Sequence, residues 1–226
     1  MNHQSLDNPV WASLHSDHAA LASRAGQVVR YPADVAPFVA VEDEAASQED
    51  VEVLVPPGEL VCFVGCAPRL AHGWRIAQTA TIAQMTCASR LEVAAGPEAT
   101  ELSQAHLADM LALTSLVYPH YFRPRTPRMG RYIGLYEHGR LAAMAGERMR
   151  CDGHTEISAV CTHPAHTGRG HARRLVALLV NRILAQGRLA FLHVSQDNLR
   201  ARVLYERLGF VHRAGIALRV VTRDPR

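Results

Sequence analysis

Two glycines between an expected strand and an expected helix are the residues of this chain whose types and spacing most clearly allow chemistry. They are Gly168 and Gly170, within residues 163–172. Because glycine has no Cβ, a ligand can lie directly against the backbone there, and the unpaired N–H groups of a first helical turn would point at it. Such a site favours anions, chiefly phosphates. The spacing therefore predicts a phosphate-binding turn.

A buried strand and an amphipathic helix are expected on either side of this turn. Residues 156–162 are β-branched or apolar on both faces, which is typical of a buried strand. Residues 170–186 place apolar side chains at helical spacing and arginines on the other faces. The strand would lead into the turn and the helix out of it.

Two familiar phosphate loops do not fit these residues. A nucleoside-triphosphate loop requires Lys and then Ser or Thr after its second glycine, whereas His171 and Ala172 follow Gly170. A dinucleotide-binding loop requires a third small residue three positions beyond Gly170, where Arg173 stands. A further interpretation, a cradle for the pyrophosphate of coenzyme A, comes from a family resemblance.

In these residues the sequence resembles the GNAT superfamily of acyl-CoA-dependent N-acetyltransferases. That family's signature is Gln or Arg, two residues, Gly, one residue, and Gly or Ala. It falls on residues 167–172, with Thr167 in place of the usual Gln or Arg. The Thr167 hydroxyl can still exchange a hydrogen bond with phosphate, but a charged contact is lost. Asn198 and residues 204–210 extend the match, and the resemblance covers roughly the last three-fifths of the chain.

The resemblance implies residues that bind acetyl-CoA, the expected cosubstrate. Main-chain N–H groups of the turn would hold the pyrophosphate, and Arg169 or Arg173 would add charge, unless these arginines only form a solvated helix face. A backbone N–H of the segment 160–162 would face the acetyl carbonyl, and Asn198 would cap a helix, contact the pantetheine arm, or do both. The full set of expected cofactor contacts is Val160, Cys161, Thr162, Thr167, Gly168, Arg169, Gly170, His171, Ala172, Arg173 and Asn198.

Two residues are expected to move protons. In the family, the tyrosine before the Gly-Phe step protonates the sulfur of coenzyme A, and Tyr205 holds that position, although it could instead be a core residue of an apolar stripe. Glu156 corresponds to the glutamate that serves as base in the histone-acetylating branch, and we expect burial to raise its pKa. Glu147, on the neighbouring strand, is a rival, and either carboxylate could simply pair with an arginine.

Composition restricts the other function classes. The 226 residues include 24 basic ones, all arginine, with a net charge of +3, and the arginines are dispersed, so no nucleic-acid partner is expected. No apolar run is long enough to cross a bilayer and no leader segment is visible, so we expect a cytoplasmic protein without a membrane partner. Five cysteines without disulfide or zinc spacing suggest reduced thiols, and Cys161 is expected to be a core residue. The 13 histidines show no recognised ligand spacing, so no metal is predicted.

The expected fold class is α/β, with a mixed sheet and helices on its faces. Residues 91–226 would form the GNAT domain, with strands at 91–95, 131–136, 140–149, 189–194 and 210–221 and helices at 102–117 and 198–208. Residues 118–129 would form a loop at the acceptor side or an ordinary connector. Residues 1–90 would form a smaller, degenerate GNAT-like half with a structural role. Within it we expect a helical segment at 8–24 with Asp17 as a candidate N-cap, and strands at 59–64 and 74–85, the second of which could also be a short helix.

The sequence thus predicts an N-acetyltransferase that moves an acetyl group from acetyl-CoA to an amine in a ternary complex. The acceptor, a small molecule or a peptide, stays open. The alternative is a non-catalytic acyl-CoA-binding or sensing module, in which the turn binds and the acid–base residues are structural.

Overall fold

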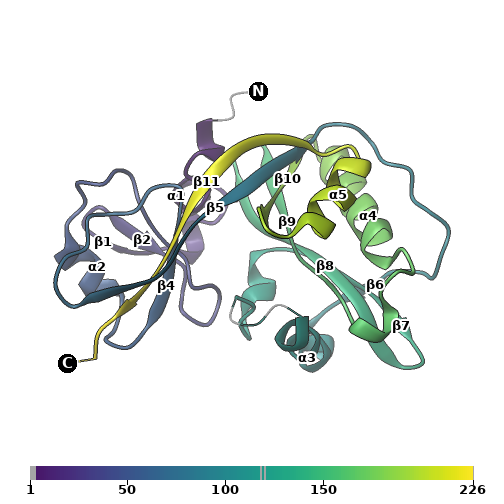
Figure 1. Ribbon diagram of the computed structural model, residues 1–226, viewed down its shortest axis with the longest axis horizontal. Helices are drawn as coiled ribbons and strands as arrows, with labels where there is room; N and C mark the ends of the chain where they lie inside the picture. The colour runs from purple at the N-terminus through teal and green to yellow at the C-terminus, as the bar shows by residue number, and fades with distance from the viewer. Residues whose placement is uncertain (1–3, 118, 120, 226) are drawn as a thin grey trace.

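The computed structural model describes residues 4–117, 119 and 121–225, and Figure 1 shows their arrangement. One eight-stranded sheet has the order β4 (Leu60–Val64), β11 (Val211–Arg223), β5 (Trp74–Cys87), β10 (Leu189–Ser195), β9 (His154–Thr162), β8 (Arg140–Cys151), β7 (Tyr132–Glu137) and β6 (Thr100–Leu102). A second sheet has the order β1 (Ser23–Ala25), β2 (Val28–Arg30) and β3 (Val39–Val41). The five α-helices of the described residues are α1 (Pro9–His15), α2 (Gln48–Leu54), α3 (Leu107–Val117), α4 (His171–Ala185) and α5 (Leu199–Arg207).

The large sheet is mixed, as the sequence predicted. Strands β9 and β10 run parallel, and the other neighbouring strands described in this sheet are antiparallel. A parallel pair needs a crossover connection, and α4 supplies it. The α/β fold class is therefore confirmed.

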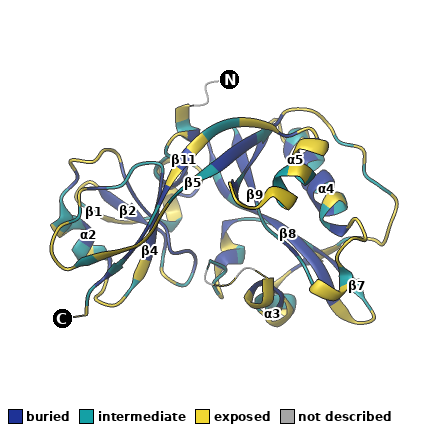
Figure 2. Ribbon diagram, in the orientation of Figure 1, coloured by how far each residue is buried: buried dark blue, intermediate teal, exposed yellow. Residues whose placement is uncertain are grey.

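Helices cover both faces of the sheet, because the side chains of β8 alternate between two apolar clusters. Ala143 and Ala145 pack in the cluster that includes the buried stripe of α4, from Leu175 to Ile183. Met144, between them, packs with Met110 of α3 on the opposite face. Figure 2 shows buried strands beneath α4 and α5, whose outer faces are exposed.

The hairpin between β7 and β8 turns at the two residues that the sequence indicated. His138 and Gly139 have φ values of 50° and 75°, the left-handed pair that matches the twist of antiparallel strands. The turn brings Glu137, the last residue of β7, to the same end of the sheet as the turn after β9.

Two local predictions are wrong. Residues 91–95 form no strand, because the Asn181 side chain bonds both the N–H and the C=O of Leu91, at 2.7 and 2.8 Å, in place of a neighbouring strand. The helical segment expected at 8–24 ends at His15, and Asp17 does not cap it. Asp17 instead pairs with Arg188 through two 3.0 Å contacts.

Strands on both sides of the expected domain boundary share the large sheet. β5, which precedes residue 90, lies between β10 and β11 and pairs with β11 from Cα partners Val211–Thr86 to Arg223–Trp74. In Figure 1 this long ribbon bridges the two parts of the molecule. The division into residues 1–90 and 91–226 stays a prediction, but both parts build one sheet.

Candidate active site

The parallel strands β9 and β10 separate halfway along their length. Their pairing covers three positions, from Leu189–His154 to Phe191–Glu156. Beyond Phe191, β10 continues to Ser195 paired only with β5, while β9 continues to Thr162 paired with β8. The facing backbone edges beyond Glu156 are thus open to a ligand.

A β-bulge lies in β9 at this opening. On β8 a single residue, Ala145, separates the partners Met144–Cys161 and Gly146–Ser158, whereas two residues, Ala159 and Val160, separate them on β9. Ala159 has φ 49°, which is unusual for a residue with a side chain. The bulge re-aims the backbone of the segment 160–162, where the sequence predicted the oxyanion donor.

The glycine turn after β9 has the open, left-handed geometry expected of a cradle. Gly168 and Gly170 both have φ 79°, and no atom lies within 4 Å of a Cβ built on either. Gly170 is the N-cap of α4 and offers no side-chain cap, so the first-turn N–H groups of His171, Ala172 and Arg173 have no side-chain acceptor there. Donors and helix dipole converge on one open surface.

Most side chains around this turn bond to other residues of the protein, whereas Arg173 is left for a ligand. Arg169 and His171 point back to Glu137, with contacts of 2.5 and 2.7 Å. Thr167 donates a 3.1 Å hydrogen bond to the Pro164 carbonyl. Arg173 forms no ion pair with any residue that the structure describes, which makes it the arginine of the turn whose charge is available to a phosphate.

A cavity of about 310 Å³ lies at the open strand edges. Residues Ile157–Cys161 line one wall, and His193, Val194 and Ser195 line another. The other lining residues come from α3, α5, β5, β11 and Arg148 of β8, and from the N-terminal part of the chain through Phe38 and Val64. Of the expected acceptor-side loop at 118–129, Tyr121 lines the cavity, while Tyr118 and His120 lie outside the described residues.

Comparison with known proteins agrees with this geometry. A sequence model of the FR47-like protein family matches residues 132–220. A protein of the GNAT acetyltransferase family from Novosphingobium aromaticivorans has a solved structure that superposes with a TM-score of 0.90, at 30% identity over 98% of this chain and 99% of that chain. The chain belongs to the GNAT family of acetyltransferases.

Other GNAT structures share the fold at lower identity. A GCN5-related N-acetyltransferase from Kribbella flavida superposes with a TM-score of 0.65 at 18% identity, covering 96% of this chain and 95% of that chain. This likeness shows the fold alone. No curated protein matches the sequence of this chain significantly. None of the described helices is long and apolar enough to cross a membrane.

Tyr205 and Asn198 of this GNAT chain both lie at the cavity. Tyr205 comes from α5, is 7% exposed and packs against Phe210 with ring centroids 5.8 Å apart, so it is both a core residue and a wall of the cavity. Asn198 is the N-cap of α5, accepts a 3.1 Å hydrogen bond from Ala201 N–H, and also lines the cavity. The two interpretations of Asn198 are compatible.

Glu156 is buried in an ion-pair network, and the expected elevation of its pKa is wrong. Burial alone would raise the pKa, but Arg148 contacts both carboxylate oxygens, at 2.6 and 2.8 Å, and His193 Nδ1 contacts Oε1 at 2.8 Å. These partners outweigh burial and hold the pKa of Glu156 at about 2. Glu156 is therefore a fixed anion at neutral pH, behind the cavity and not among its lining residues.

Glu147, the rival base, is also fully buried and paired. Its Oε2 contacts the Arg150 guanidinium, and Arg182 Nε lies 4.0 Å from Oε1. It does not line the cavity. Neither carboxylate singled out from the sequence thus faces the space where an acceptor would lie.

His193 is the site residue that the sequence reasoning missed. It stands in the cavity wall in front of Glu156, on β10. Gln84 Oε1 accepts a 2.7 Å hydrogen bond from Arg213, which fixes the orientation of the Gln84 amide. The Gln84 Nε2 atom therefore faces both Leu6 O and His193 Nε2, each at 2.9 Å. Since Gln84 Nε2 can only donate, His193 accepts at Nε2 and carries its proton on Nδ1, toward Glu156. A polar residue inside the apolar run Leu192–Val194 was the available signal.

Cys161 lies in the cavity wall but is buried, with 1% exposure. Burial raises the pKa of its thiol to about 12, so the thiolate needed for attack is scarce at neutral pH. Its expected place in the core is confirmed. All five cysteines are free.

Proposed function

We propose that the protein is an acetyl-CoA-dependent N-acetyltransferase that moves the acetyl group directly to an amine. The observation that carries the proposal is the continuity of three features along β9. The open strand edge, the bulge at Ala159 and the glycine turn follow one another from the cavity to the N-terminus of α4. An extended thioester cofactor that lay along β9 would meet main-chain donors at its reactive end and at its phosphate end.

The turn would bind the pyrophosphate, and the bulge would direct a main-chain N–H group at the acetyl carbonyl. N–H groups of residues 168–172 would donate to the phosphate oxygens, and Arg173 would add charge. A main-chain N–H of the segment 160–162 would stabilise the oxyanion, a contribution of about 2.7–4 kcal/mol to the transition state in comparable sites. Because main-chain donors carry most of both roles, Thr167 in place of the usual Gln or Arg is compatible with them.

Tyr205 and the His193–Glu156 pair would move the protons. The amine attacks the thioester carbonyl, and His193 takes the amine proton at Nε2 as Gln84 yields its hydrogen bond. The fixed carboxylate of Glu156 stabilises the imidazolium that forms. The C–S bond then breaks, and the thiolate of coenzyme A takes the proton of the Tyr205 hydroxyl. In this scheme Glu156 positions the base and is not itself the base.

The acceptor would enter from the side formed by Phe38, Val64 and Tyr121. These walls are mainly apolar, and Arg148, whose guanidinium lies 4.9 Å from the centroid of the Phe38 ring, has its charge offset by Glu156. The proposed acceptor class is thus a small or peptidyl amine with an apolar body.

A thiol-release assay with acetyl-CoA and a panel of amines and amino-acid amides tests the proposal. Tyr205→Phe should lower turnover by about 10²–10⁴-fold while leaving the Kd of coenzyme A unchanged. The matched control is Tyr136→Phe, whose hydroxyl donates to Asp109 outside the cavity. If wild type binds coenzyme A but no amine elicits thiol release, the alternative of a non-catalytic acyl-CoA-binding or sensing module is favoured.

A further inference from the structure

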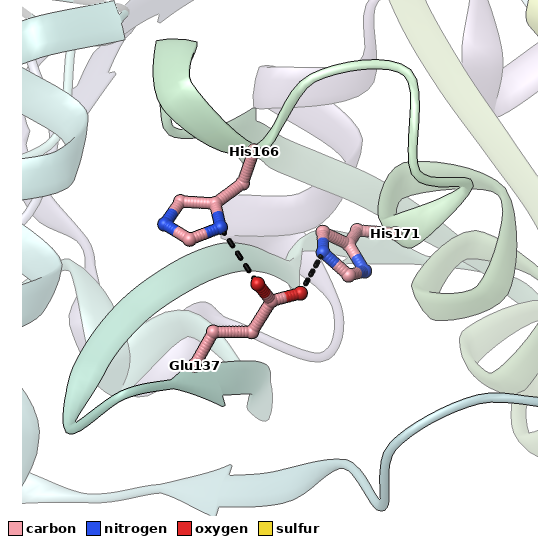
Figure 3. A group of neighbouring side chains, drawn as sticks. All are labelled: Glu137, His166 and His171. Carbon is pink, nitrogen blue, oxygen red and sulfur yellow. Dashed lines mark hydrogen bonds and ion pairs between the residues drawn. The ribbon is translucent and has the colours of Figure 1, made fainter.

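We propose that Glu137, His166 and His171 form a binding site for a divalent transition metal of the zinc class. They come from the end of β7, the turn after β9 and the first residue of α4 (Figure 3). Their ligand atoms all lie within 4.8 Å of one another. Two of its residues flank the glycine turn in the chain, and the existence of the site does not depend on acetyl transfer.

The two histidines approach the two oxygens of one carboxylate. His166 Nδ1 lies 2.8 Å from Glu137 Oε2, and His171 Nε2 lies 2.7 Å from Oε1. Figure 3 shows each ring with a nitrogen turned toward the carboxylate. Two imidazoles and one carboxylate are a ligand set used by zinc sites that keep a fourth position for water.

His171 supplies a second and independent observation. Its side chain is only 5% exposed, and Nε2 lies 2.7 Å from Glu137 Oε1 without the geometry of a regular hydrogen bond. The pairing of this buried nitrogen thus rests on one badly directed contact, and a metal ion that accepts its lone pair would replace that contact by a coordinate bond.

The donor set favours transition metals over magnesium and calcium. Mg²⁺ and Ca²⁺ prefer oxygen ligands throughout, whereas two of the three ligands here are imidazole nitrogens, which suit Zn²⁺, Co²⁺ and related ions. The side chains of His166 and Glu137 are 15% and 19% exposed, so solvent can supply a further ligand.

Arg169 competes with a metal for the same carboxylate. Its guanidinium lies 2.5 Å from Glu137 Oε2 and already offsets the negative charge that a cation would use. Removal of this arginine should therefore tighten metal binding. A network held together by ion pairs alone predicts no such gain, so the sign of this effect separates a metal site from a purely structural cluster.

A bound metal would join the β7–β8 hairpin to the phosphate turn. Glu137 precedes the hairpin turn, and His166 and His171 flank Gly168 and Gly170. The ion would thus link the hairpin to the segment that contains the left-handed turn.

The test is titration of the chelator-treated full chain with Zn²⁺ alone, followed by calorimetry, and with Co²⁺, followed by its visible absorption. A Cys66→Ser background removes the least buried thiol. We expect one Zn²⁺ per chain and a tetrahedral-type Co²⁺ spectrum, no binding of Mg²⁺, and a loss of affinity of at least about tenfold in His166→Gln and Glu137→Gln. Arg169→Gln should bind Zn²⁺ more tightly than wild type.

The control variant is His138→Asn, which removes an imidazole next to Glu137 and keeps a residue type that tolerates the left-handed φ of 50°. It should bind Zn²⁺ as wild type does. The partly exposed His166 is substituted in place of the buried His171, because a variant at His171 could fail to fold. The proposal is overturned if stoichiometric binding is absent, if His166→Gln and His138→Asn bind equally, or if Arg169→Gln gains nothing.

Discussion

The two ends of α4 offer a matched pair of substitutions that isolates the cradle. Gly170 lies at the N-cap with φ 79°, and Gly187 lies just beyond the C-terminal end with φ 73°. No atom lies within 4 Å of a Cβ built on either glycine. Alanine at each position therefore meets the same backbone strain and no clash within the chain.

The two variants should lose similar stability and differ in binding. A left-handed conformation costs a residue with a side chain about 1–2 kcal/mol, so both variants should unfold more easily by that amount. Only the Gly170→Ala methyl group projects into the place proposed for the pyrophosphate. Loss of one hydrogen bond to a charged group is worth about 1.5–3 kcal/mol, which corresponds to a Kd for coenzyme A raised roughly tenfold to 150-fold.

Urea unfolding and calorimetric titration with coenzyme A measure the two effects separately. Gly187→Ala should show the loss of stability with an unchanged Kd, and Gly170→Ala should show both changes. Equal Kd values in the two variants, despite equal strain, would refute the reasoning that places the diphosphate against this backbone.

Three further predictions concern titratable groups. His193→Gln should lower turnover by about 10²–10⁴-fold without weakening coenzyme A binding, as thiol release and calorimetry would show, and normal turnover would remove His193 from the proton route. Glu156→Gln should destabilise the fold by about 3–5 kcal/mol in urea, because it leaves Arg148 as a buried charge without its anion; near-wild-type stability would contradict this. Burial first, and then Arg150, lower the pKa of His18 to about 4, below its ordinary value of 6.5. The unfolded chain thus binds the His18 proton more readily than the folded chain does. The contribution of His18 to the free energy of unfolding is therefore fully present above pH 6.5, and up to about 3 kcal/mol of it is lost as the pH drops toward 4. His18→Asn should abolish this pH dependence of the free energy of unfolding.

Predictions from the sequence were correct where the local structure depends only on residues close together in the chain. The left-handed glycines, the turn at His138 and Gly139 and the apolar stripe of α4 each follow from backbone preference or periodicity within a few residues. These features sufficed for the fold class and for the left-handed turn in which the cradle is proposed.

The failures came from contacts between distant segments. Residues 91–95 have a strand-like composition, but the side chain of Asn181 satisfies Leu91 and no strand forms. The pKa of Glu156 depends on Arg148, eight residues away, and on His193, 37 residues away. Burial could be anticipated from the strand pattern, whereas the partners that reverse its effect could not.

The same limit applies to the proposed metal ligands. Glu137 and His166 lie 29 positions apart in the chain, so no ligand spacing reveals them. They meet because the β7–β8 hairpin and the turn after β9 lie at one end of the sheet. Histidine counts in a sequence carry little information until the topology is known.

The measurement that tests the account most directly is a single turnover in which the protein, acetyl-CoA with a labelled acetyl group and an active amine are mixed and followed by mass spectrometry. The account predicts that the label passes to the amine nitrogen and that none accumulates on the protein, because the Cys161 thiol is buried and protonated. Label that remains on the protein before it reaches the amine, or label that never leaves coenzyme A, would contradict direct transfer at this site.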